Sequence, residues 1–177
     1  YRTHGITRDE KLMKNSSQGG WYYEQIALGL NYRMTDIQAA LGVSQMSRLN
    51  DFILKRNKLA ERYDASLNNL PLVIPHQIED SFSSRHLYVI RLKLDKISLS
   101  HKEVFNKLRE NGIGVNLHYI PVHLHPYYRD LGFTKGQFPI SETYYRDAIS
   151  IPLFSSMTTN QQDEVINILT SILKNSS

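Results

Sequence analysis

The sequence predicts an α+β fold in which a long N-terminal helix precedes a small antiparallel sheet that carries helices on one face. Apolar residues recur at three- and four-residue steps over residues 35–68, where no proline interrupts them. Short apolar segments separated by proline and glycine follow, and one of them alternates strictly. At 177 residues, of which 41% are hydrophobic, the chain is long enough to bury a core.

The composition excludes several classes of protein. The chain has no cysteine, which excludes a disulfide framework and a thiolate metal site and is typical of the cytoplasm. No stretch approaches the ~18–20 continuous apolar residues of a membrane helix, so we expect no membrane partner. The formal net charge is +4, but the basic residues are scattered along the chain, so we expect no nucleic-acid partner.

Residues 1–30 show no sustained period and are expected to form a loop with at most short ordered pieces. Gly19-Gly20 is followed by the aromatic run Trp21-Tyr22-Tyr23, which would pack against a neighbour or cover a ligand. The opening residues YRTHGITRDE start at Tyr1 and lack the pattern of a signal peptide. We therefore expect this segment to be the tail end of another domain within a larger chain.

One long helix is predicted over residues 35–68. Thr35-Asp36-Ile37-Gln38 forms a capping box, in which threonine and glutamine each satisfy a backbone N–H at the helix start. A helix of this length would extend about 50 Å at ~1.5 Å per residue. We expect it to bridge two bodies or to lie in a subunit interface.

Residues 69–177 are predicted to form a small α/β domain. Capping boxes at Ser100 and Thr158 begin two helices, and Asn111-Gly112 ends the first of them. Pro121 and Pro126 are expected to keep residues 119–130 irregular, with at most one helical turn. The predicted strands are 72–74, 86–94, 113–117 and the edge strand 149–153, and a further short helix is predicted over 141–148.

Asn31-Tyr32-Arg33-Met34 directly precedes the first capping box. A helix start exposes backbone N–H groups and carries the positive end of the helix dipole. Arginine adds charge-assisted hydrogen bonds to a phosphate. The pattern therefore indicates an anion site, with an ordinary cap beside an exposed arginine as the alternative.

Three histidines, His118, His123 and His125, lie close together beside Tyr119. Histidine is the commonest metal ligand, but no acidic residue follows them before Asp130 and the HExxH pattern is absent, so we expect no metal. The histidines could instead form structural hydrogen bonds or recognise a polar or anionic ligand. The chain contains no nucleophile elbow, P-loop or dinucleotide-binding motif.

Several motifs together resemble those of one enzyme family, the nucleotide-sugar aminotransferases of the DegT–StrS group. These are fold-type-I enzymes that use pyridoxal 5'-phosphate (PLP), and the motifs are most similar to those of members in pseudaminic acid biosynthesis. The resemblance runs over essentially the whole chain in the expected order. The matching motifs are RTHG at residues 2–5, GLNYRMTDIQAALG at 29–42, HYIPVH at 118–123 and SIPL at 150–153.

The resemblance implies that this chain is the C-terminal part of such an enzyme, with a tail end of the large PLP-binding domain (1–34), an inter-domain helix (35–68) and the small domain (69–177). The lysine that forms the Schiff base would precede the chain, so we expect no catalytic residue here and no activity of this part alone. In a homodimer with active sites at the interface, Asn31 and Arg33 would bind the cofactor. Tyr32, His118, Tyr119 and His123 would line the substrate site.

The activity that the resemblance implies is transfer of an amino group from glutamate to a 4-keto-6-deoxy nucleotide sugar linked to UDP or dTDP. The product would serve surface polysaccharide or flagellin glycan synthesis. Two alternatives stay open: a related PLP-dependent sugar dehydratase, which carries histidine in place of the lysine, and a non-enzymatic dimerisation domain.

Overall fold

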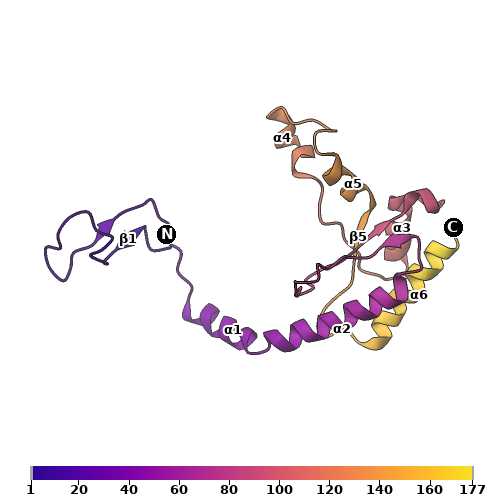
Figure 1. The fold of residues 1–177 in the computed structure, drawn as a ribbon, viewed down its shortest axis with the longest axis horizontal. Coiled ribbons are helices and arrows are strands. Elements are labelled where there is room, and N and C mark those ends of the chain that lie inside the picture. The colour runs from indigo at the N-terminus through magenta and orange to yellow at the C-terminus, as the bar shows by residue number, and fades with distance from the viewer. Residues whose placement is uncertain (1, 177) are drawn as a thin grey trace. The chain divides into compact units, whose positions relative to one another are not determined.

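A computed structural model describes residues 2–176. They form two compact units, of which the first ends at Leu49 and the second begins at Asn50. Figure 1 shows a short hairpin and one helix in the first unit, and a sheet with surrounding helices in the second. In the described part of the chain, no helix has both the length and the apolar composition to cross a membrane.

The first unit contains the short ordered pieces that the sequence predicts. Strand β1 (Ile6–Thr7) pairs antiparallel with β2 (Glu24–Gln25). An isolated bridge between Thr3 and Asn31 continues the antiparallel pairing beyond β2. The two segments that flank the hairpin therefore lie side by side.

Helix α1 (Asp36–Met46) begins at the predicted capping box. The Thr35 hydroxyl accepts a hydrogen bond from the Gln38 backbone N–H, and the Gln38 side chain accepts one from the Thr35 N–H. No residue of α1 is buried. A helix with exposed apolar side chains on this scale is typical of a surface that another polypeptide covers.

The expected single helix over residues 35–68 is wrong, because α1 ends before α2 (Leu49–Leu67) begins. At the break, the Ser47 hydroxyl donates a hydrogen bond of 2.8 Å to the Ser44 carbonyl. The Arg48 N–H bonds to the Gln45 carbonyl, three residues back. Serine side chains can compete in this way with the backbone hydrogen bonds of a helix. The spacing of apolar residues continues across the break, so it could not indicate where the helical hydrogen bonds stop.

The second unit is built on a three-stranded antiparallel sheet in the order β3-β4-β5. Its strands are β3 (Leu72–Val73), β4 (Tyr88–Leu92) and β5 (Ala148–Ile151). The predicted alternation of β4 is confirmed, since Tyr88, Ile90 and Leu92 are buried while the residues between them are half-buried. As predicted, β5 is an edge strand, and it ends just before Pro152, which has no N–H to donate to a ladder.

The predicted strand over residues 113–117 is wrong. Only Asn116 forms a bridge, with Ser150 of β5. The Val115 N–H bonds to the Ile113 carbonyl two residues back, which bends the chain around Gly114 and prevents a regular ladder. Ile113 and Val115 are buried on either side of the exposed Gly114, so a strand-like alternation of burial without the hydrogen bonds of a ladder explains the wrong assignment.

Helices α2, α3 (His101–Glu110) and α6 (Thr159–Lys174) share one hydrophobic core with the sheet. Both predicted capping boxes, at Ser100 and Thr158, are present. The most deeply buried core side chains include Tyr63 and Leu67 of α2, Val104 and Leu108 of α3, and Leu169 and Leu173 of α6. The unit is an α+β domain, as the sequence predicts.

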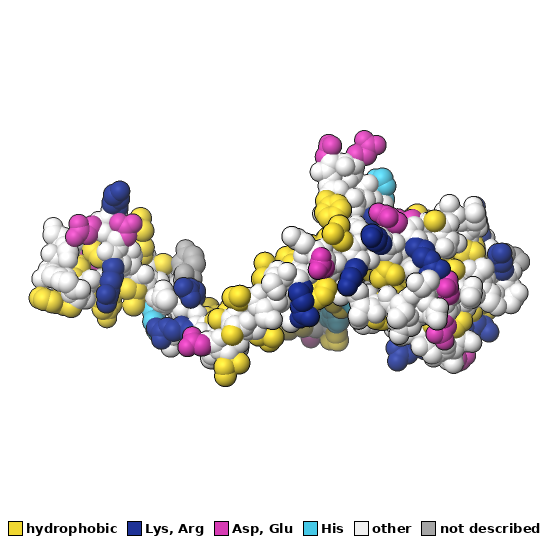
Figure 2. Space-filling view, turned by 90° about the horizontal axis from the view of Figure 1, so that it is seen from below, with side chains coloured by type: hydrophobic (Ala, Val, Ile, Leu, Met, Phe, Trp, Pro, Cys, Tyr) yellow, Lys and Arg dark blue, Asp and Glu magenta, His cyan; other side chains and the backbone are white. Residues whose placement is uncertain are grey.

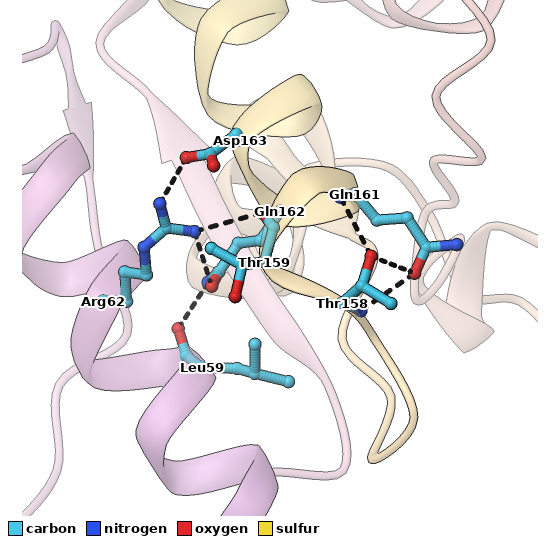
Figure 3. Close-up of polar contacts among 7 residues, drawn as sticks. All are labelled: Leu59, Arg62, Thr158, Thr159, Gln161, Gln162 and Asp163. Carbon is cyan, nitrogen blue, oxygen red and sulfur yellow. Dashed lines mark hydrogen bonds and ion pairs between the residues drawn. The ribbon is translucent and has the colours of Figure 1, made fainter.

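A polar link between α2 and α6 completes this packing (Figure 3). The fully buried Gln162 side chain donates to the Leu59 carbonyl at 2.7 Å and accepts from the Arg62 guanidinium at 3.1 Å. Arg62 also forms an ion pair with Asp163. Because a buried amide without partners is costly, these bonds fix the position of α6 on α2.

A long connecting segment leads from α3 to β5. It contains the short helices η2 (Val122–Leu124), α4 (Pro126–Asp130) and α5 (Pro139–Asp147), and a single turn, η1 (Leu94–Lys96), precedes α3. Residues 119–130, predicted to be irregular with one helical turn at most, therefore hold two short helical pieces. The division into functional domains at residues 34 and 68 concerns the whole protein and stays a prediction.

Candidate cofactor and substrate site

The segment before α1 is held next to the start of the described chain. The Tyr32 N–H donates to the Arg2 carbonyl and the His4 N–H donates to the Leu30 carbonyl, both at 3.0 Å. This pairing surrounds an open hollow of about 850 Å³. The hollow is lined by Arg2, Asn31, Tyr32, Arg33, Met34 and Gln38.

Two glycines allow this close approach. A Cβ atom on Gly29 would lie 2.0 Å from the Gly5 nitrogen and 2.3 Å from the His4 carbonyl carbon. Gly5 has a φ of +71°, a conformation that L side chains rarely adopt. The site therefore depends on glycine at both positions, several residues away from its polar side chains.

The hollow offers donors to an anion. Arg2 and Arg33 carry guanidinium groups and Asn31 an amide, and all three side chains are exposed. Among residues 2–176, neither arginine forms an ion pair with an acidic side chain. The hollow lies at the N-terminus of α1, where the helix dipole favours negative charge. These groups fit a phosphate monoester such as that of PLP.

Sequence reasoning selected Asn31, Tyr32 and Arg33 for this site, and the structure brings all three to the same hollow. It did not select Arg2 or Gln38 as site residues. Arg2 reaches the hollow through a backbone pairing across about thirty residues, which no local pattern reports. The RTHG motif was the only signal that could have indicated it.

The residues predicted for the substrate lie in the second unit. His118 is half-buried, and its Nδ1 lies 2.7 Å from the Ser150 hydroxyl. Its ring meets the neighbouring Tyr119 ring edge-on, with 4.7 Å between the centroids. Tyr119 is 72% exposed. The pair thus combines a fixed imidazole with an accessible phenol.

His123 is in a different environment from His118. It is buried in η2, with its Nε2 2.9 Å from Glu142 Oε1 and its ring against Phe138. This arrangement is a structural hydrogen bond, one of the alternatives that the sequence left open. A role of His123 in the substrate site stays a prediction. No group of three or more potential metal ligands occurs in residues 2–176.

The contact between His123 and Glu142 predicts a pH dependence. The hydrogen bond from His123 and a second from the Gly136 N–H lower the pKa of Glu142 below its ordinary value. A carboxylate with a lowered pKa stabilises the fold above its ordinary pKa, and the contribution is lost as the pH falls through the lowered value. We expect Glu142→Gln to lower the melting temperature most at neutral pH, where the carboxylate stabilises the fold, and least in strong acid, so that the acid limb of the thermal-stability profile becomes flatter. An unchanged acid limb would contradict the proposed coupling.

The sequence of this chain matches a known protein family. A model of the DegT/DnrJ/EryC1/StrS aminotransferase family matches residues 1–170. The chain belongs to this family. It is 37% identical over 174 residues to the spore coat polysaccharide biosynthesis protein SpsC of Bacillus subtilis, covering 97% of this chain and 44% of SpsC.

A second DegT/DnrJ/EryC1/StrS relative is the UDP-4-amino-4,6-dideoxy-N-acetyl-β-L-altrosamine transaminase of Campylobacter jejuni, 33% identical over 98% of this chain and 43% of the transaminase. Among solved structures, the PLP-form of Spr1654 from Streptococcus pneumoniae superposes with a TM-score of 0.79 at 26% identity, over 98% of this chain and 42% of that one. A PMP-form of the same protein is also similar. PLP is thus the cofactor of the family. The chain spans less than half the length of these relatives.

Proposed function

We propose that this chain is the C-terminal part of a PLP-dependent aminotransferase that transfers the amino group of glutamate to a 4-keto-6-deoxy nucleotide sugar. The product would enter surface polysaccharide or flagellin glycan synthesis of the pseudaminic acid type. This is supported by the relatives SpsC, a spore coat polysaccharide biosynthesis protein, and the altrosamine transaminase of Campylobacter jejuni. The observation that carries the proposal is the hollow before α1, where Arg2, Asn31 and Arg33 converge and where neither arginine has an acidic ion-pair partner among residues 2–176.

Asn31 and Arg33 each have a defined task in the proposal. Asn31 donates its amide N–H to a phosphate oxygen, and Arg33 balances the charge of the dianion. Tyr32, His118, Tyr119 and His123 are assigned to the nucleotide-sugar substrate. PLP, when bound, supplies an electron sink, and the protein supplies binding and orientation. The lysine that binds the cofactor covalently is assigned to the part of the protein outside this chain.

Exposed apolar side chains on α1 support a homodimer with the active site at its interface. Ile37, Leu41, Val43 and Met46 are each more than 60% exposed. Hydrophobic side chains lie open along this unit in Figure 2. Several large apolar side chains exposed on one helix are typical of a surface that another polypeptide covers. A second copy that covers α1 would bring its own groups to the neighbouring hollow.

The full-length protein that contains this chain provides the test. We expect it to bind PLP, to convert bound PLP to PMP when L-glutamate is added, and to return to the PLP state with a 4-keto-6-deoxy sugar linked to UDP or dTDP. Absorbance would follow both half-reactions, and mass spectrometry would identify an amino sugar. Loss of water from the sugar without amination would indicate the dehydratase, and absence of PLP binding would indicate a dimerisation domain. Either result would overturn the proposal.

A further inference from the structure

We propose that Ser150 is a positioning residue, which holds the His118 imidazole so that its Nε2 faces an oxygen atom of the nucleotide-sugar substrate. The inference rests on the proposed function, because that function assigns His118 to the substrate. The inference adds to the site a residue that contacts no ligand itself. It also explains why the otherwise apolar strand β5 contains a serine.

The backbone places the two residues together. The Ser150 N–H donates to the Asn116 carbonyl at 2.8 Å, and the Asn116 N–H donates to the Ser150 carbonyl at 3.1 Å. Two residues that exchange both backbone N–H···O=C bonds form a hydrogen-bonded antiparallel pair. Leu117 is held as well, since its N–H bonds to the Asn116 side-chain oxygen at 2.8 Å. The segment leading to His118 is therefore anchored to β5, which pairs with β4 on its other side.

The register of this pair directs Ser150 toward His118. His118 follows Asn116 by two residues, and Asn116 is bridged to Ser150, so the bridge brings His118 close to Ser150. The 2.7 Å distance between the Ser150 Oγ and His118 Nδ1 shows that the two side chains meet.

The burial of Ser150 shows that its hydroxyl needs this partner. Ser150 is 5% exposed, and the other residues of β5, Ala148, Ile149 and Ile151, are buried and apolar. A buried hydroxyl without a hydrogen bond is destabilising, so an apolar residue would serve the core better at this position. The His118 ring is the group that makes a serine favourable here.

Holding Nδ1 has a chemical consequence for Nε2. The hydrogen bond of one imidazole nitrogen fixes the ring orientation and determines which nitrogen carries the proton. The edge-on Tyr119 ring restricts the imidazole further. A ring that is already oriented loses less conformational freedom on binding a ligand, which improves affinity. Ser150 should therefore affect substrate binding more than glutamate binding or fold stability.

A double-mutant cycle in the full-length protein tests the inference. We expect Ser150→Ala to raise the KM for the 4-keto nucleotide sugar about three- to tenfold, the factor that corresponds to one neutral hydrogen bond. The rate of the glutamate half-reaction should stay at the wild-type value. In a His118→Ala background the same serine substitution should have no further effect on KM, because the ring that it positions is gone. Ser156→Ala, at an exposed position, is the matched control.

A second measurement is independent of activity. With ¹⁵N-labelled histidine, the two ring-nitrogen shifts of His118, assigned by their loss in His118→Ala, should move toward those of a freely exchanging imidazole in Ser150→Ala and stay unchanged in Ser156→Ala. Unchanged ring shifts, or an equal loss in both half-reactions together with a lowered melting temperature, would overturn the positioning role. Perturbed ring shifts in a protein that does not transfer amino groups would contradict the proposed function alone.

Discussion

Replacing Asn31 with alanine in the full-length protein is expected to weaken PLP binding by about 1–3 kcal/mol, or roughly 5- to 150-fold. Asn31 lines the hollow before α1 with an exposed amide, and the proposal directs that amide to a phosphate oxygen. The substitution removes the side chain but keeps the backbone bridge to Thr3, so the shape of the segment should persist. Titration of the cofactor-free protein with PLP measures the effect directly.

A matched control separates a cofactor contact from a general loss of stability. Asn68 is exposed just beyond the end of α2, and Asn68→Ala should leave PLP affinity unchanged. The melting temperatures of both cofactor-free variants should equal that of the wild type. Wild-type PLP affinity in Asn31→Ala would remove the cofactor role of this residue, and an equal loss in both variants would assign the effect to folding.

Local rules explain most of what the sequence predicted correctly. Each capping box, at Thr35, Ser100 and Thr158, depends on two side chains three residues apart. The alternation of β4 depends on the two-residue period of a strand. The α+β class follows from these elements because their apolar faces can be buried only against one another.

The wrong predictions concern backbone hydrogen bonds that apolar spacing does not report. The Ser47 hydroxyl takes part in ending α1, although the apolar period continues into α2. The short-range bond from Val115 to Ile113 bends a segment that is apolar enough to resemble a strand. In both places a bond within three residues determines the backbone, while the hydrophobic pattern reports only burial.

The candidate site shows the same division between local and long-range information. Asn31 and Arg33 were predictable because they directly precede a helix start. Arg2 joins them through an antiparallel pairing, and Glu142 reaches His123 across nineteen residues. Contacts between segments that are distant in sequence depend on the tertiary fold, which single-sequence patterns do not determine.

A second large effect is expected from a substitution at Gly29, whose backbone lies very close to that of Gly5. Gly29→Ala should destabilise the first unit by about 1–3 kcal/mol or more, because overpacking forces neighbouring backbone apart. The added Cβ would meet three backbone atoms within 2.8 Å, the nearest being the Gly5 nitrogen at 2.0 Å. No flexible side chain can move aside to relieve this overlap. The segment that carries Asn31 must therefore separate from the segment that carries Arg2.

Gly20→Ala distinguishes this steric effect from a general intolerance of substitution, since a Cβ on Gly20 would meet no atom within 4 Å. Neither glycine has a positive φ, so the two variants differ in the space around the new methyl group and not in backbone strain. In the full-length protein we expect Gly29→Ala to lose PLP affinity at least as strongly as Asn31→Ala, with faster hydrogen exchange at the Tyr32 and His4 amides. Gly20→Ala should match the wild type in both measurements. Wild-type exchange and PLP affinity in Gly29→Ala would show that the hollow does not depend on the contact between the two segments.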